Sequence, residues 1–119
     1  MSARAKYEEL RKHFYEVSLL STIGSLLGWD QRVMMPRGGV KHRAEQIALV
    51  EKLVHERLTD PRIGEWLDAV EKSDLVSDPE SVEAVNIRWW RWYYEREIKI
   101  PVEWVEEFAR VTTLAEKIW

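Results

Sequence analysis

The fold of this chain is decided by the stretch Leu26-Leu27-Gly28-Trp29-Asp30-Gln31-Arg32-Val33-Met34-Met35-Pro36-Arg37-Gly38-Gly39. Its second part, Met34–Gly39, contains a proline and paired glycines, which break helices, so this segment is predicted to be a connection. A first helix is predicted over residues 5–27, because apolar side chains recur there at three- and four-residue steps. A second helix is predicted over residues 40–58. The two helices are expected to form an antiparallel helical hairpin.

The later part of the first predicted helix is apolar on more than one side. Its large apolar residues are Leu19, Leu20, Ile23, Leu26 and Leu27. A helix with this pattern is expected to be buried on more than one side. Small residues lie between them at Ser21, Gly24, Ser25 and Gly28. Another backbone can approach the helix closely at such positions.

Three shorter helices are predicted downstream, and each begins near a proline. Asp60 and Pro61 form a cap and first turn, and Asp78-Pro79 repeats this signal for a helix that reaches about Ile98. Pro101 ends that helix and opens a fifth one. The apolar stripes of the three helices are Ile63, Trp66, Leu67 and Val70; Val82, Val85, Trp89, Trp92 and Tyr93; and Trp104, Phe108, Val111, Ala115 and Ile118. The predicted fold is all-α, with about five helices in a single domain over residues 1–119.

Composition limits the classes of function. The chain has 119 residues, of which 45% are hydrophobic and 33% charged, which is typical of a globular protein. A net charge of −3 gives no general electrostatic basis for binding nucleic acid. No apolar stretch is long enough to cross a membrane. The sequence has no cysteine, which excludes disulfides and thiolate zinc sites and fits a cytoplasmic location. Scarce Asn and Gln favour a thermophilic source.

The triplet Trp29-Asp30-Gln31 is the first candidate site. The simpler interpretation is that Asp30 and Gln31 bond to nearby backbone at the end of a helix while Trp29 packs. The functional interpretation places Asp30 on the wall of a substrate cleft. We favour the simpler one on spacing alone.

The three histidines do not form a recognisable metal site. His55-Glu56 resembles the start of an HExxH zinc helix, but Thr59 stands where the second histidine is needed. We therefore expect His55 to lie on the helix surface or near its last turn. His13 and His42 are not spaced to pair with it. No catalytic residue, metal ligand or cofactor is expected in this chain.

The densest aromatic run contains Trp89, Trp90, Trp92, Tyr93 and Tyr94 among three arginines. Such a run can stack on the bases of single-stranded nucleic acid. On a helix, however, Trp89, Trp92 and Tyr93 face one way, while Trp90 and Tyr94 form a second face. Two aromatic faces favour packing on two sides, so the run is interpreted as a packing or partner surface.

The opening stretch continues into His42-Arg43-Ala44-Glu45-Gln46 and resembles the carboxypeptidase Taq family of thermostable zinc metallocarboxypeptidases. The similarity continues through Leu53–Pro61, Ile63–Leu67, Ala84–Arg88 and Ile100-Pro101. It extends from about Tyr7 to Trp119 and corresponds to about the first quarter of a family member. The resemblance implies the N-terminal part of an all-helical enzyme that removes single amino acids from peptide C-termini with one zinc or cobalt ion.

The resemblance also implies which parts of the enzyme are missing. The N-terminal helices of the family form the wall and cover of a long cleft, whereas its HExxH lies downstream and has no counterpart here. This chain alone is therefore expected to be inactive. It is either the lid and cleft wall of a carboxypeptidase or a freestanding helical binding module. The helical pattern from Thr112 to Trp119 ends without a cap, as expected of a segment cut from a longer protein.

Two partners are expected for the aromatic surface. One is the missing catalytic body, and the other is a second copy of the chain in a homodimer or higher oligomer. A peptide substrate is expected only in the full-length enzyme. Neither nucleic acid nor a membrane is an expected partner.

Overall fold

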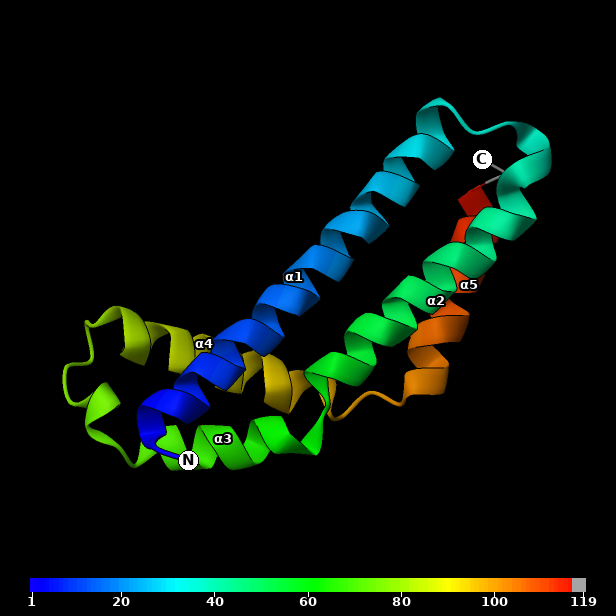
Figure 1. Cartoon of the computed structure of the whole chain (residues 1–119). Coiled ribbons are helices and arrows are strands. Elements are labelled where there is room, and N and C mark those ends of the chain that lie inside the picture. The colour runs from blue at the N-terminus through cyan, green and yellow to red at the C-terminus, as the bar shows by residue number, and fades with distance from the viewer. Residues whose placement is uncertain (117–119) are drawn as a thin grey trace. The chain divides into compact units, whose positions relative to one another are not determined.

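The computed structural model describes residues 1–116 and is helical throughout (Figure 1). Its helices are α1 (Ala3–Val33), α2 (Val40–Leu58), α3 (Pro61–Glu71), α4 (Val82–Glu97) and α5 (Val102–Glu116), with short 3-10 turns η1 (Arg37–Gly39) and η2 (Asp74–Val76). No strand occurs in residues 1–116. The prediction of an all-α fold with five main helices is confirmed. Ile118, which was predicted to extend the stripe of the fifth helix, lies outside the described residues.

The helices divide into two compact units. Unit 1 contains Met1–Glu16 and Arg57–Lys99, and unit 2 contains Val17–Glu56 and the residues from Ile100 onward. Unit 1 therefore holds the start of α1 together with α3, η2 and α4. Unit 2 holds the rest of α1, most of α2, and α5.

Unit 1 is built around a compact apolar core. Its buried members are each at most 4% exposed: Tyr7, Leu10, Ile63, Leu67, Val70 and Ile87. Trp90 of α4 stacks on Phe14 of α1 with 5.4 Å between ring centroids. The stripes predicted for the start of the first helix and for the third helix are the ones that pack here, as expected of amphipathic helices.

The helix starts in unit 1 are set by side-chain caps. Asp60 accepts a hydrogen bond from the backbone N–H of Arg62 at the start of α3, as predicted. The predicted start of the fourth helix at Asp78-Pro79 is wrong. Asp78 instead accepts from the N–H of Glu80 in a turn, and Ser81 caps α4 by accepting from the N–H of Ala84.

Unit 2 contains three helices that run side by side. The antiparallel hairpin of α1 and α2 is confirmed, and α5 lies beside α2 (Figure 1) and contacts α1 near its end, at Gln31. Ion pairs join Arg110 and Lys52 to glutamates across α2 and α5, and Arg32 of α1 pairs with Glu116 of α5. Helices held at three separate points along their lengths form one packed unit.

The interior of unit 2 is made of small residues. Ala44, Ala48, Ala109 and Thr113 are buried, together with Val40 and His55. Small side chains allow helix axes to approach closely, so few large apolar groups are enclosed. In α1, Gly24 lies near the side chain of Val50, whereas Gly28 has open space where a Cβ would stand. Side chains of α2 contact α1 at Gly24, and the approach of another backbone that was predicted here is not seen at Gly24 or Gly28.

The largest apolar stripes of α4 and α5 lie on the outside of this chain. Trp89 and Trp92 of α4 are 53% and 49% exposed, and Trp104 and Phe108 of α5 are exposed to a similar degree. The packed face of α4 instead carries Ala84, Ile87, Trp90 and Tyr94. The spacing of apolar residues correctly identifies these stripes. It does not show which face of each helix packs against the rest of this chain.

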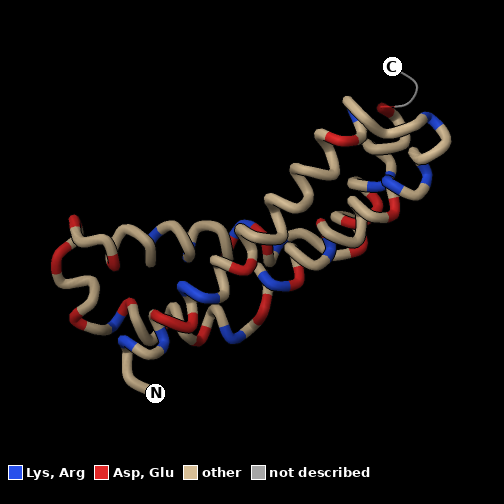
Figure 2. Tube along the Cα trace, turned by 45° about the horizontal axis from the view of Figure 1, so that its top comes forward, with Lys and Arg blue, Asp and Glu red and all other residues tan. Residues whose placement is uncertain are grey.

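Charged residues are distributed unevenly along the helices. The part of α1 between Val17 and Trp29 has no charged residue, and Figure 2 shows it as a continuous tan stretch. Elsewhere both acidic and basic residues occur along the helices. Among the described residues, no helix combines the length and the apolar content needed to cross a bilayer.

Candidate functional site

Asp30 belongs to a polar cluster that joins α1 to α2. The triplet Trp29-Asp30-Gln31 lies near the end of α1, as predicted, although the helix continues to Val33 and not only to residue 27. Asp30 Oδ2 accepts a hydrogen bond from Arg43 Nη2 at 2.7 Å, and Arg43 Nη1 donates to the carbonyl of Leu27 at 2.8 Å. The Arg43 side chain is only 15% exposed. The Asp30 carboxylate is thus held by a guanidinium that also binds the backbone of α1.

The other two residues of the triplet have different environments. Gln31 Nε2 donates to the carbonyl of Thr113 at 3.3 Å and so links α1 to α5. Trp29 is 57% exposed and does not pack as the simpler interpretation required. The triplet therefore supplies two polar helix-to-helix contacts and one exposed aromatic ring. None of these groups is arranged as a nucleophile with a base.

Two of the histidines are bound to main-chain carbonyls. His13 Nε2 donates to the carbonyl of Arg57, and His55 Nε2 donates to the carbonyl of Ile100, each at 2.6 Å. A carbonyl only accepts, so each Nε2 carries the proton in these contacts. Of the two positions expected for His55, the last turn of α2 is correct and the helix surface is wrong, because His55 is buried and links α2 to the segment before α5.

The described residues do not fit a metal site. Within residues 1–116, no group of three or more His, Cys, Asp or Glu side chains is placed to hold a metal ion. A zinc site needs at least three such protein ligands on one centre. No step of a metal-dependent reaction can be assigned to this part of the molecule.

The aromatic run of α4 divides into two faces. Trp90 and Tyr94 pack against the core of unit 1, where the Tyr94 ring approaches within 3.2 Å of the Cβ position of Gly64. On the other face, Trp89, Trp92 and Tyr93 contact one another, with ring centroids 5.1 to 5.8 Å apart. We call this second set, together with Val82, Val85 and Arg96, the α4 seam.

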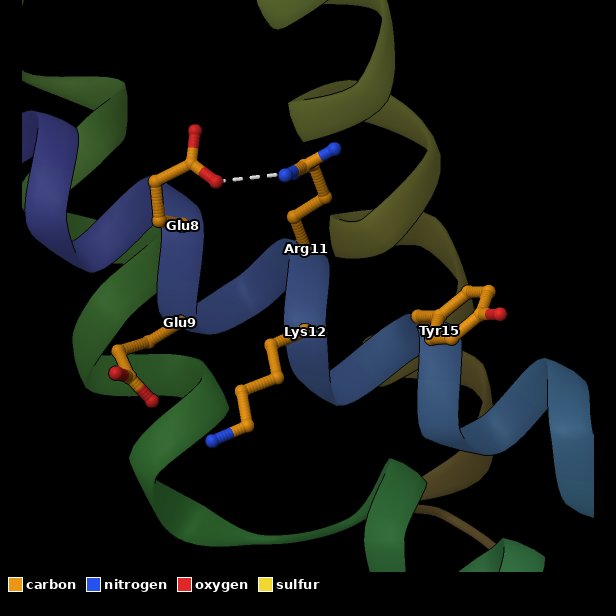
Figure 3. Close-up of a pocket in the computed structure, with 5 residues that line it drawn as sticks. All are labelled: Glu8, Glu9, Arg11, Lys12 and Tyr15. Carbon is orange, nitrogen blue, oxygen red and sulfur yellow. Dashed lines mark hydrogen bonds and ion pairs between the residues drawn. The ribbon is translucent and has the colours of Figure 1, made fainter.

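Two surface hollows lie in unit 1. One, of about 310 Å³, is lined by Val85, Arg88, Trp89 and Trp92 of α4. The other, of about 560 Å³, is lined by residues of α1 that include Glu8, Arg11 and Tyr15 (Figure 3). Its side chains are mostly charged, and Arg11 donates to Glu8 within the lining. The α4 hollow combines two tryptophans and a valine with one arginine and has no carboxylate in its lining, which suits an apolar or acidic ligand.

The charged groups with the largest pKa shifts are ion pairs that hold helices together. The pKa of Arg91 is raised above its ordinary value, chiefly by hydrogen bonding to Glu71 and also to Asp68 of α3. The pKa of Arg110 is raised by the hydrogen bonds that its guanidinium donates to Glu45 of α2 and to Glu106. Asp60 has a lowered pKa because Arg62 hydrogen-bonds its carboxylate. The shifted pKa values of these groups therefore come from structural ion pairs. They do not mark a cluster of catalytic groups in a cleft.

Sequence reasoning found the aromatic side chains but not the groups that organise them. Arg96 lies over the rings of Trp92 and Tyr93 at 4.7 and 5.7 Å, and Arg43 organises the Asp30 cluster. The one available signal was the placement of arginines among the aromatic residues of α4. No local signal links Arg43 to Asp30, because that contact depends on the hairpin.

Comparisons with known proteins give a consistent result. A family model described as Carboxypeptidase Taq (M32) metallopeptidase matches residues 9–119. The chain is 47% identical over 119 residues to thermostable carboxypeptidase 1 of Thermus thermophilus, which covers 100% of this chain and 23% of that protein. It is 32% identical over 99 residues to thermostable carboxypeptidase 1 of Pyrococcus furiosus, covering 80% of this chain and 18% of that protein. The chain thus spans less than a quarter of the length of these relatives.

Proposed function

The chain belongs to the carboxypeptidase Taq (M32) family of metallopeptidases, and from this premise we propose that it forms the N-terminal helical part of a metal-dependent carboxypeptidase. In this role it contributes the wall and cover of a substrate cleft and is not catalytic by itself. The rest of the enzyme removes C-terminal amino acids from peptides and holds the metal, zinc or cobalt. A peptide substrate is bound only when both parts are present.

One observation carries this proposal. The whole chain aligns with only 23% of the Thermus thermophilus carboxypeptidase, so the similarity is to one segment of a much longer enzyme. The distribution of possible ligands supports a non-catalytic role, because no group of three or more His, Cys, Asp or Glu side chains within residues 1–116 is placed to hold a metal ion.

The exposed apolar surface supports a role as part of a larger body. Large apolar side chains are exposed on the α4 seam, on the outer face of α5 at Trp104 and Phe108, and along the later part of α1. Contiguous apolar patches on a soluble protein usually mark interaction surfaces. The remaining part of a carboxypeptidase would cover them.

A chimera tests the proposal directly. This chain replaces the aligned segment of the Thermus thermophilus carboxypeptidase, and release of the C-terminal amino acid from a peptide is measured with added zinc or cobalt. The chimera is expected to retain activity, and this chain alone is expected to have none. An inactive chimera beside an active parent enzyme would contradict the proposed role. Activity of the isolated chain would contradict its non-catalytic nature.

A second function is favoured by the same exposed surface. The chain would then act alone, as a helical protein-binding or regulatory module derived from the family. The mass of the gene product in source cells, measured by immunoblot and peptide mass spectrometry, separates the two. A product of 14.2 kDa supports the freestanding module. A much heavier product with HExxH peptides supports the carboxypeptidase.

Self-association is the expected behaviour of the isolated chain. Its exposed apolar stripes have no covering body, so a homodimer or higher oligomer is expected. Light scattering at tens of micromolar protein measures this directly. A monomer at that concentration would contradict it.

We further propose a cytoplasmic location. The support is compositional, since the chain has no cysteine. Cell fractionation with an antibody to the chain tests it, and recovery in a secreted fraction would contradict it.

A further inference from the structure

The α4 seam has the spacing of a helix-packing surface. Val82, Val85, Trp89, Trp92 and Arg96 follow one another at steps of three, four, three and four residues. This alternation keeps side chains on one face and is typical of a helix that packs along another helix. The core of unit 1 lies against the opposite face of α4, so unit 1 does not use the seam for its own packing.

The seam is ordered although it is exposed. Trp89 contacts both Trp92 and Tyr93, and the guanidinium of Arg96 lies 4.7 Å from the centroid of the Trp92 ring. Rings fixed by one another lose little conformational entropy when a partner covers them. Aromatic residues and arginine are also the types that dominate binding energy at interfaces.

The charge along the seam is basic. Arg88 lines the hollow beside Trp89 and donates to the carbonyl of Pro79, a neutral acceptor that leaves its positive charge uncompensated. Arg96 is more than half exposed, and Glu97 offsets part of its charge at 3.5 Å. A partner that covers these groups gains most if it brings carboxylates to the edge of the seam, as helices in coiled coils do.

We propose that the α4 seam is the docking site for an acidic amphipathic helix in the part of the carboxypeptidase that this chain does not span. This inference rests on the proposed function. The seam covers fourteen residue steps, or about 21 Å, which matches a helix of about four turns. A second copy of α4 in parallel fits less well, because it would place Arg96 beside Arg96 within the seam.

The experiment compares the same substitutions in two settings, the isolated chain and the chimera with the Thermus thermophilus enzyme. Trp89→Ala and Arg88→Glu change the seam. Tyr15→Ala and Arg11→Glu are matched controls, because both residues are exposed in unit 1 and lie outside the seam. Melting temperature is measured for every variant in both settings, and activity is measured for the chimeras.

Seam substitutions are expected to lower the melting temperature of the chimera by several degrees and to change that of the isolated chain by much less. The control substitutions are expected to change neither. The effect of Arg88→Glu in the chimera is expected to shrink at high salt, because the lost interaction is electrostatic.

Three results would overturn the inference. In an active chimera, equal shifts in both settings would show that the seam acts only within unit 1. In a second result, light scattering shows that Trp89→Ala dissociates an oligomer of the isolated chain, and the substitution has no selective effect on the melting temperature of the chimera. This combination would assign the seam to contact with a second copy of the chain. An inactive wild-type chimera would overturn the proposed function itself, and the docking site with it.

Discussion

Unit 1 buries Leu10, Ile63 and Leu67 completely, whereas the interior of unit 2 is built mainly from Ala44, Ala48, Ala109 and Thr113. Several large apolar side chains of unit 2 are instead exposed, among them Leu26, Trp104 and Phe108. Both units consist of three main helical segments joined by ion pairs. They differ in which side of each helix the chain covers.

The difference separates helices that complete their own core from helices that need a partner. Burial of apolar area is the dominant favourable term in folding, so a unit with a small-residue interior gains less from its own packing. Unit 2 is therefore expected to depend on contacts outside this chain more strongly than unit 1. Substitutions in each unit test this difference through their effects on the free energy of unfolding.

The largest expected effect is a core truncation in unit 1. Leu67→Ala removes a side chain that is 0% exposed and is expected to destabilise the chain by about 2–5 kcal/mol. The matched change in unit 2, Leu26→Ala, removes a side chain that is 66% exposed and is expected to cost less than about 0.5 kcal/mol. Urea unfolding at fixed protein concentration measures both. Equal losses would remove the contrast between the units.

Enlarging the interior of unit 2 is the next test. Ala48 is buried on α2, and Ala48→Leu is expected to cost about 1–3 kcal/mol because the helices cannot separate without losing their ion pairs. Leu49→Ala, at the exposed neighbour, is the control and is expected to be nearly neutral. If Ala48→Leu raised the melting temperature of the chain, the interior of unit 2 would contain unfilled space. The inference that its helices approach one another closely would then be wrong.

The Asp30 cluster should give an intermediate effect. Arg43→Met removes the hydrogen bonds to Asp30 and Leu27 while keeping most of the apolar stem, and a loss of about 1–2 kcal/mol is expected. In a double-mutant cycle with Asp30→Asn, the two losses are expected to be less than additive, because the residues share one interaction. Strict additivity in chemical denaturation would show that the contact contributes nothing.

The sequence alone predicts much of this architecture. The hairpin follows from Pro36 and the paired glycines, and the α3 start follows from Asp60, because both signals are local. The core of unit 1 follows from the period of α1 and α3. The side on which α4 packs cannot be read in the same way, because both of its faces are aromatic. Gly64 leaves room for the Tyr94 ring, and Trp90 packs against Phe14, and neither contact has a local signal in α4.

The candidate sites were less predictable. The contact between Asp30 and Arg43 joins two helices and has no local pattern. His55 was expected on the helix surface or near its last turn, and it lies in the last turn but is buried. Its burial depends on the carbonyl of Ile100, which is 45 residues away in the sequence. Long-range contacts of this kind decide the role of a polar residue.

Gly28 offers a smaller test of how unit 2 is covered. A Cβ at Gly28 meets no atom within 4 Å, so Gly28→Ala is expected to stabilise the isolated chain by about 0.5–1 kcal/mol through helix propensity. In the chimera the same substitution is expected to lose this gain if another backbone approaches α1 there. Thermal unfolding of both proteins measures the difference. Equal stabilisation in both would show that this face of α1 stays open.

The smallest expected effect is the pH dependence contributed by Asp60. Its folded-state pKa is lowered from 3.8 because Arg62 hydrogen-bonds the carboxylate. The unfolded state therefore binds the proton more readily, and stability is fully present above pH 3.8 and lost as the pH falls through the folded-state pKa. The effect is small because the Arg62 guanidinium is exposed to solvent.

Asp60→Asn tests this assignment, because asparagine keeps the capping acceptor but cannot titrate. Urea unfolding is measured for both proteins from neutral pH down to about pH 3. The variant is expected to be slightly less stable at neutral pH and to lose less stability on acidification. This local change belongs to the start of α3 in unit 1, so it should be the same in the isolated chain and in the chimera. A different acid response in the chimera would show that the covering body also reaches this end of unit 1.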